Sequence, residues 1–365
     1  MKKLYLIILI LIGSISFSIG QEDNYGGDVL DTTLNNFKSS YIFTPNPNGT
    51  KKYIRLIIHF LLKDDGTCNF NEVNDGLNPA NIYSGYAYAE YIVDYMNSHM
   101  SNPCEMHLQP FGPIPVYDCE YRFELVGTYF WRSTANYNAD LSTLQNTYGK
   151  NKDECINIFL INDINSSGGY VRYLGDNAVW SGIHYQRYID AVNNNNTWYN
   201  SFTQRLLNHE IGHCFNLHHT LMTGNGVCTN NYNDYCDDTP TIQDMLDLGE
   251  PDPCCWNASY CSNNLMDYNA QKCALTPDQL GRVHEELDNN KYYYWRNHFT
   301  NPQVDICNIT NSNTYIGKKV TVSKNCTSVI NNGTVVFINA SEVELYPGFI
   351  IYPGGSLTIK TNKNN

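Results

Sequence analysis

Residues 209–219 read HEIGHCFNLHH. On an α-helix, His209 and His213 lie one turn apart on the same face. Both imidazoles can then reach one metal ion about 2 Å away, with Glu210 beside them. This pattern predicts a helix that carries two ligands of a zinc ion and an adjacent carboxylate.

A third ligand has to come from beyond this helix, because catalytic zinc is held by three protein groups and a water molecule. His219 lies six residues after His213, so it reaches the same ion only if the chain reverses in between. Asn216 stands at the position of that reversal, and Asn adopts positive φ more readily than any residue except Gly. We favour His219 as the third ligand, and the adjacent His218 is the alternative.

Two further patterns extend outward from this segment. Ser201 and Gln204 have capping-box spacing, which predicts that the zinc helix begins there. About fifty residues after the histidines, Leu265-Met266-Asp267-Tyr268 is followed by Thr276-Pro277-Asp278-Gln279. The second tetrapeptide is again a capping box, now with Pro at the first helical position, and it predicts another helix.

The chain of 365 residues begins with a pattern typical of export. Lys2 and Lys3 precede an apolar run over 4–12, and small residues lead to a cleavage position after Gly20. The apolar run is about half the length that spans a bilayer, so a signal peptide is favoured over an anchor. We expect a secreted or cell-surface protein with no transmembrane segment.

Thirteen cysteines suit the oxidising conditions outside the cytoplasm. The odd number leaves at least one thiol unpaired. Cys214 is our candidate, since it lies inside the helical pattern beside the metal ligands, where a buried thiol behaves as a small apolar side chain.

The fold class follows from the order of apolar patterns. Runs typical of strands cover 53–62, 121–126, 156–160 and 178–185, and helical patterns over 80–100 and 138–148 lie between the first three. Alternating strands and helices predict a mixed sheet. After Trp295, short alternating strands separated by Asn-Gly, Pro-Gly and Gly-Gly turns predict a small all-β module.

These boundaries divide the chain into four segments. We predict a signal peptide over 1–20, an N-terminal extension or short propeptide over 21–50, a zinc metallopeptidase domain over 51–300, and a C-terminal module of β-strand repeats over 301–365. The tail resembles the repetitive β tails of exported bacterial proteins. Two roles are open for it: sorting or surface attachment, or packing on the peptidase domain to stiffen the C-terminus.

The segments HEIGHCFNLHH and NNLMDYNAQKCALTPDQ together resemble the metzincin metallopeptidases, and among them the pappalysin (cytophagalysin-like) family. The resemblance covers about residues 51–295. It implies an α+β fold: a metzincin-like catalytic domain with a mixed twisted sheet, two long helices and an irregular lower subdomain.

The same resemblance assigns roles to individual residues. The residues that it places at the zinc site are, in order, the ligands His209, His213 and His219, the general base Glu210, Met266 of the Met-turn below the metal, and the nearby catalytic tyrosine Tyr268. It also implies a disulfide between Cys261 and Cys273 and another from Cys228 to Cys254 or Cys255. Asp237 and Asp238 resemble a segment near structural calcium, and solvated loop acids are the alternative.

The sequence therefore favours a secreted zinc endopeptidase, active on protein or peptide substrates and monomeric, with Zn²⁺ as its cofactor and Ca²⁺ as a candidate second ion. A formal net charge of −13 argues against nucleic acid as a partner. Two other interpretations remain. One is a zinc exopeptidase whose third ligand comes from His284-Glu285-Glu286, and the other is a surface-binding protein with a vestigial zinc site.

Overall fold

The computed structural model describes residues 39–73, 84–108, 114–163, 168–194, 198–221, 233–249, 262–267, 272–295, 298–301 and 303–361. The predicted signal peptide lies outside these residues. Within them, no helix is both long and apolar enough to cross a bilayer.

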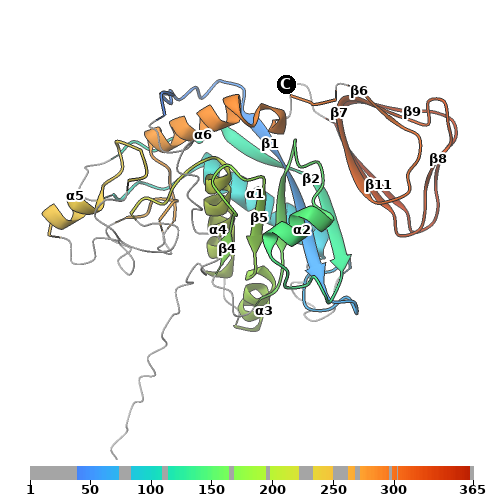
Figure 1. Ribbon diagram of the computed structural model, residues 1–365, viewed down its shortest axis with the longest axis horizontal. Helices are drawn as coiled ribbons and strands as arrows, with labels where there is room; N and C mark the ends of the chain where they lie inside the picture. Colours follow the sequence, from blue (N-terminus) through green and yellow to red (C-terminus); the bar gives the residue numbers. More distant parts are fainter. Residues whose placement is uncertain are drawn as a thin grey trace, which may run out of the picture.

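A five-stranded mixed sheet forms the centre of the molecule (Figure 1). Its order is β2 (Tyr121–Arg132), β1 (Lys52–Leu62), β3 (Ile156–Leu160), β5 (Ala178–Ser181) and β4 (Gly169–Tyr170). The first four strands are parallel, and β4 pairs with β5 in the antiparallel sense. The prediction of a mixed sheet is confirmed.

Strand β1 shows why the sheet is covered on both faces. Alternate residues of a strand point to opposite sides. Ile54, Leu56 and Ile58 belong to the main core, whereas Ile57 and Leu61 belong to clusters on the other face. All five are fully buried, as expected for a central strand of a largely parallel sheet.

Helices cover the main-core face of the sheet. The principal ones are α1 (Gly85–Ser101), α4 (Trp198–Cys214) and α6 (Pro277–Asn289), all of which contribute to that core. Shorter elements are α2 (Leu141–Tyr148), α3 (His184–Asn194), α5 (Ile242–Asp247) and the 3₁₀ turn η1 (Tyr292–Tyr294). Helix α4 begins at Trp198, so the predicted start at Ser201 is wrong: the capping-box spacing falls inside the helix. The predicted strand over 178–185 is also too long, because β5 ends at Ser181 and α3 begins at His184.

The C-terminal strands wind into a parallel coil beside β2, seen almost end-on in Figure 1. They are β6 (Gln303–Ile306), β7 (Asn313–Val322), β8 (Ser328–Ile330), β9 (Val335–Leu345), β10 (Phe349–Ile351) and β11 (Ser356–Thr361). One parallel sheet has the order β11-β9-β7-β6, and β10 pairs with β8 in a second. Each turn of the coil thus stacks on the one before, as in a solenoid. The predicted domain boundaries stay predictions.

The coil packs on the face of the central sheet that α1 and α4 leave uncovered. Ile316 and Phe337 of the coil cluster with Ile57 and Val126 of the sheet. Arg55 is fully buried at this contact. Its Nη1 donates to the carbonyls of Tyr293 and His298, and its Nε donates to Oδ1 of Asn339 on β9, so the buried charge is solvated by oxygen atoms from two segments.

Candidate metal centre

Helix α4 ends in a Schellman motif that turns the chain back toward the helix. The amide of Leu217 donates to the carbonyl of Gly212, and the amide of Asn216 donates to that of His213, both at 3.0 Å. Asn216 has φ 66°, as the spacing predicted. Arg282 of α6 fixes this turn by donating to the carbonyl of Asn216 at 2.9 Å. The reversal brings the residues after Leu217 beside the last turn of α4.

Three histidines converge through their Nε2 atoms. The Nε2 of His219 lies 3.2 Å from that of His209 and 3.0 Å from that of His213. Nitrogen ligands about 2 Å from a tetrahedral zinc ion are separated by roughly 3.3 Å, so the spacing fits. In the part of the chain that the structure describes, this is the one group of three or more potential ligands close enough to hold a single ion.

The hydrogen bonds of the outer nitrogens support the same conclusion. His209 Nδ1 lies 2.7 Å from the carbonyl oxygen of Leu265, and His213 Nδ1 lies 2.7 Å from that of Leu217. A carbonyl accepts, so each Nδ1 carries the proton and each Nε2 presents a lone pair. Two such lone pairs directed toward the Nε2 of His219 suit a cation between the three rings. The donor set fits zinc, and His209, His213 and His219 would hold it.

Glu210 lies next to the edge of the sheet. It is buried, with 1% of its surface exposed. A Cβ atom built on Gly169 of β4 would lie 3.3 Å from Oε1 of Glu210, so the carboxylate packs directly against this strand. Strand β4 is the last in the sheet order, so the carboxylate of Glu210 lies at an edge of the sheet.

Met266 lies below the zinc helix, where the sequence predicted a Met-turn. A Cβ built on Gly212 would lie only 2.5 Å from its Sδ, so the absence of a side chain at Gly212 permits the contact. Asn264 holds this turn. Its Oδ1 accepts from the amide of Met266 at 2.8 Å, and its Nδ2 donates to Oε1 of Gln279 at 2.8 Å.

Gln279 connects the turn to α6. Its Oε1 accepts from the backbone amide of Thr276, and its own backbone amide donates to the Thr276 hydroxyl, which is the predicted capping box. Sequence reasoning identified this box but missed Asn264. The sequence did offer one clue to Asn264. The side-chain amide of Gln279 can form more hydrogen bonds than the capping box uses, so a second partner was to be expected.

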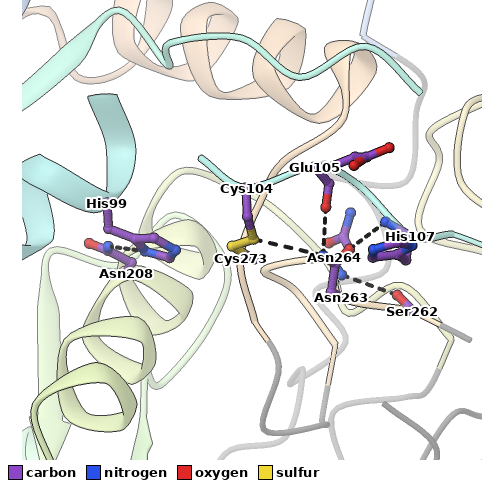
Figure 2. Close-up of a disulfide and its surroundings, with 9 residues drawn as sticks. All are labelled: His99, Cys104, Glu105, His107, Asn208, Ser262, Asn263, Asn264 and Cys273. Atoms are coloured by element: carbon purple, nitrogen blue, oxygen red, sulfur yellow. Dashed lines mark hydrogen bonds between the residues drawn. A yellow bond between two sulfur atoms is a disulfide. The ribbon is translucent and has the colours of Figure 1, made fainter. Parts of the chain in front are cut away.

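A disulfide joins Cys104 to Cys273, with the Cα atoms 5.8 Å apart (Figure 2). The predicted pairing of Cys273 with Cys261 is therefore wrong. The physical reason is a strand-like contact that brings the segment after α1 beside the Met-turn. Asn263 exchanges hydrogen bonds with His107 and also donates to the carbonyl of Glu105. Spacing within the loop gave no sign of this distant segment.

Other predicted residues lie apart from the centre or outside the described residues. His218 packs edge-on against Tyr235 and is not in the group of three. His284 stacks on Phe43 and hydrogen-bonds the carbonyl of Cys119, so it does not join the zinc ligands. Cys214 is a buried free thiol, as predicted. The predicted residues that fall outside the described parts of the chain are Tyr268, Cys228, Cys254, Cys255 and Cys261.

The acidic loop is arranged differently from the expectation. Asp237 is exposed, whereas Asp238 is half-buried and its buried Oδ1 atom has no hydrogen-bond partner. Sequence reasoning missed Asp234, which is buried and whose Oδ2 is likewise without a partner. Burial raises the pKa of Asp234 to about 7. The loop thus contains two carboxylates, those of Asp234 and Asp238, that each have one buried oxygen atom without a hydrogen-bond partner.

The mixed sheet, the helix with HEIGH, the third histidine beyond a sharp turn and the methionine below them define a metallopeptidase of the metzincin class. A family model described as pregnancy-associated plasma protein-A (Peptidase_M43) matches residues 142–288. Over these residues the match supports a peptidase of that pappalysin family, for which zinc is the expected metal. No curated protein matches it.

Proposed function

We propose that the protein is an exported zinc-dependent endopeptidase. The observation that carries the proposal is the convergence of three buried histidines through their Nε2 atoms, with a buried glutamate next to His209 in the sequence. Zinc in such a site lowers the pKa of a bound water toward about 7 and polarises a carbonyl group. Export rests on the sequence of residues 1–20 alone.

Glu210 is proposed to act as the general base. It immediately follows His209 on α4, and its buried carboxylate packs against Gly169 of β4. Its carboxylate accepts the proton of the attacking water and then delivers it to the leaving amine of the peptide. Tyr268 is proposed to donate a hydrogen bond to the developing oxyanion.

Cleavage at internal bonds is supported by β4. An edge strand can pair with an extended peptide, and the peptide then continues past the scissile bond in both directions. Gly169 contacts Glu210, so a peptide lying along β4 passes the general base. This arrangement favours an endopeptidase over trimming from one end.

We also propose a calcium site at Asp234 and Asp238 in place of Asp237. Two enclosed carboxylate oxygens without partners are suitable hard ligands. Binding of ⁴⁵Ca²⁺ to the wild type and its loss in Asp234→Asn would support the site. Equal binding in both proteins would exclude it.

The main test compares Glu210→Gln with Glu90→Gln, a change at an exposed position of α1. We expect Glu210→Gln to retain one zinc per chain and to lose at least about 10³-fold in turnover, because general base catalysis and proton delivery are both removed. Glu90→Gln should keep full activity. The readouts are zinc content and the fragments of a protein substrate.

The fragments also separate the rival interpretations. Internal cuts that a chelator abolishes support the proposal, whereas release of single terminal residues supports an exopeptidase. A wild-type chain that binds zinc and cuts nothing points to a surface protein. Near-normal turnover of zinc-loaded Glu210→Gln would refute the role of this residue.

A further inference from the structure

Among the described residues, the last turn of the coil has apolar side chains that are uncovered. We define the open rung as β10, the connecting residues 352–355 and β11. Among the described strands, β11 pairs with β9 alone and β10 with β8 alone. Each therefore leaves one side of its backbone without a strand neighbour, and strands of this kind readily pair with another chain.

The register shows that the exposed side chains belong to the interior of the coil. Ile351 stacks on Ile330, and Ile359 stacks on Ile338. Ile330 and Ile338 are 0% and 1% exposed, whereas Ile351 and Ile359, one turn later in the same columns, are 44% and 38% exposed. The open rung thus presents the core of the solenoid to solvent. Repeat proteins ordinarily cover such ends with a polar cap.

Charge identifies the occupant that suits this surface. The whole chain carries a net charge of −13, so most contacts between two copies bring acidic groups together. Residues 346–361 contain no acid and a single base, Lys360. Lys360 is already engaged, since its Nζ donates to the carbonyl of Leu125. The open rung is therefore an acid-free apolar surface on which two copies can meet without repulsion.

We propose that the open rung is a homodimer interface, at which β11 pairs antiparallel with β11 of a second copy. A twofold contact uses the same patch on both subunits, so one self-complementary rung is sufficient. With Thr358 paired to its own counterpart, Leu357 lies opposite Ile359 of the second copy and the inward columns stay aligned. This replaces the expectation of a monomer.

The peptidase centre takes no part in this contact. The coil packs beside β2, and the metal ligands lie near β4, at the other end of the sheet order. Four strand spacings separate these edges, or about 19 Å. Dimerisation through the open rung should therefore leave turnover of a small peptide unchanged, which separates this proposal from the proposed function.

The test is sedimentation velocity of the full exported chain at micromolar concentration. We expect twice the chain mass, and a tighter dimer at higher salt, because salt screens the repulsion of two acidic molecules while the apolar contact persists. Ile359→Lys should give the monomer. Ile42→Lys is the matched control, since Ile42 is 86% exposed outside the coil, and it should leave the dimer intact.

A second variant, Ile351→Lys, keeps the test informative if Ile359→Lys disturbs the coil, and circular dichroism checks the fold of each. A wild type that stays monomeric at every salt concentration overturns the proposal. So does a dimer that survives both lysine variants. Loss of the dimer in both, with the fold and peptide turnover retained, supports it.

Discussion

Asn216 carries two unfavourable features in one residue. It holds the left-handed conformation at φ 66°, and its side-chain Oδ1 is buried without a hydrogen-bond partner. Both follow from its place between the second and third histidines, where the chain must reverse. The turn itself depends on the backbone, because Arg282 binds the Asn216 carbonyl and not its side chain.

We expect Asn216→Gly to be at least as stable as the wild type and about 1 kcal/mol more stable than Asn216→Ala. Both variants remove the partnerless oxygen, so the difference between them measures the cost of a Cβ in the left-handed region. Urea unfolding of the zinc-loaded proteins gives the two free energies. An alanine variant equal to the glycine variant would show that this backbone conformation is not strained.

At the scale of elements, α4 and the Met-turn are fitted to each other at one glycine. A helix interior ordinarily disfavours Gly, so Gly212 is explained by the methionine sulfur that occupies the space of its missing side chain. The contact holds the floor of the site against the turn of helix that carries both His209 and His213.

We expect Gly212→Ala to destabilise the protein by about 1 to 3 kcal/mol, because an added methyl group 2.5 Å from Met266 Sδ overpacks the site. Zinc affinity should fall with it, since the last turn of α4 has to move. The compensating double variant Gly212→Ala/Met266→Ala should recover part of the zinc affinity. Additive losses of affinity in the double variant would argue that the two residues do not compete for space. Zinc titration and thermal unfolding supply both quantities.

The same elements show what the sequence could predict. The zinc helix, the reversal at Asn216 and the capping box of α6 are local, since each depends on residues within a few positions of one another. The partner of Cys273 is not local: it is set by the pairing of Asn263 with the segment at Glu105 and His107. Asp234 was missed for a similar reason, because its burial depends on the loop around it.

At the scale of the whole molecule, the sequence predicted short C-terminal strands but missed β6 and β8, and it gave no strand pairing. Alternating runs such as 335–337 and 357–359 indicate strands without giving their neighbours. The spacing of about 21 residues between stacked positions, as from Ile338 to Ile359, becomes meaningful only once the strands are seen to be parallel. Burial of Arg55 between the coil and the sheet was likewise invisible, because a charged residue in a strand is ordinarily exposed.

The molecule as a whole should be sensitive to acid. Burial lowers the pKa of His59 and His184 to about 3, and of His99 and His284 to about 4. In the unfolded chain these groups titrate near 6.5. Below that pH the unfolded chain binds protons at these histidines, whereas the folded protein does not. Their contribution to the free energy of unfolding is therefore fully present above about pH 6.5 and is lost as the pH falls toward 3.

His59 gives this prediction a specific test. The indole N–H of Trp131 donates to Nδ1 of His59 at 3.0 Å, and Nε2 of His59 lies 2.9 Å from Oδ1 of Asn157. Protonation of the ring at Nδ1 would therefore place the new N–H against the indole N–H. We expect His59→Phe to be less stable at neutral pH but to lose stability less steeply between pH 6.5 and 4, by up to about 1.4 kcal/mol per pH unit. Equal slopes in urea unfolding would contradict the assignment.

The bond between Cys104 and Cys273 spans 169 residues, and that stretch contains His209, Glu210 and His219. Closing so long a loop restricts the unfolded chain by about 5 kcal/mol in the entropic account. It also means that a nick anywhere inside the stretch cannot release a fragment. A self-digested preparation would migrate as one species on a non-reducing gel and as two once a thiol is added, so apparent homogeneity under oxidising conditions says nothing about whether the backbone is intact.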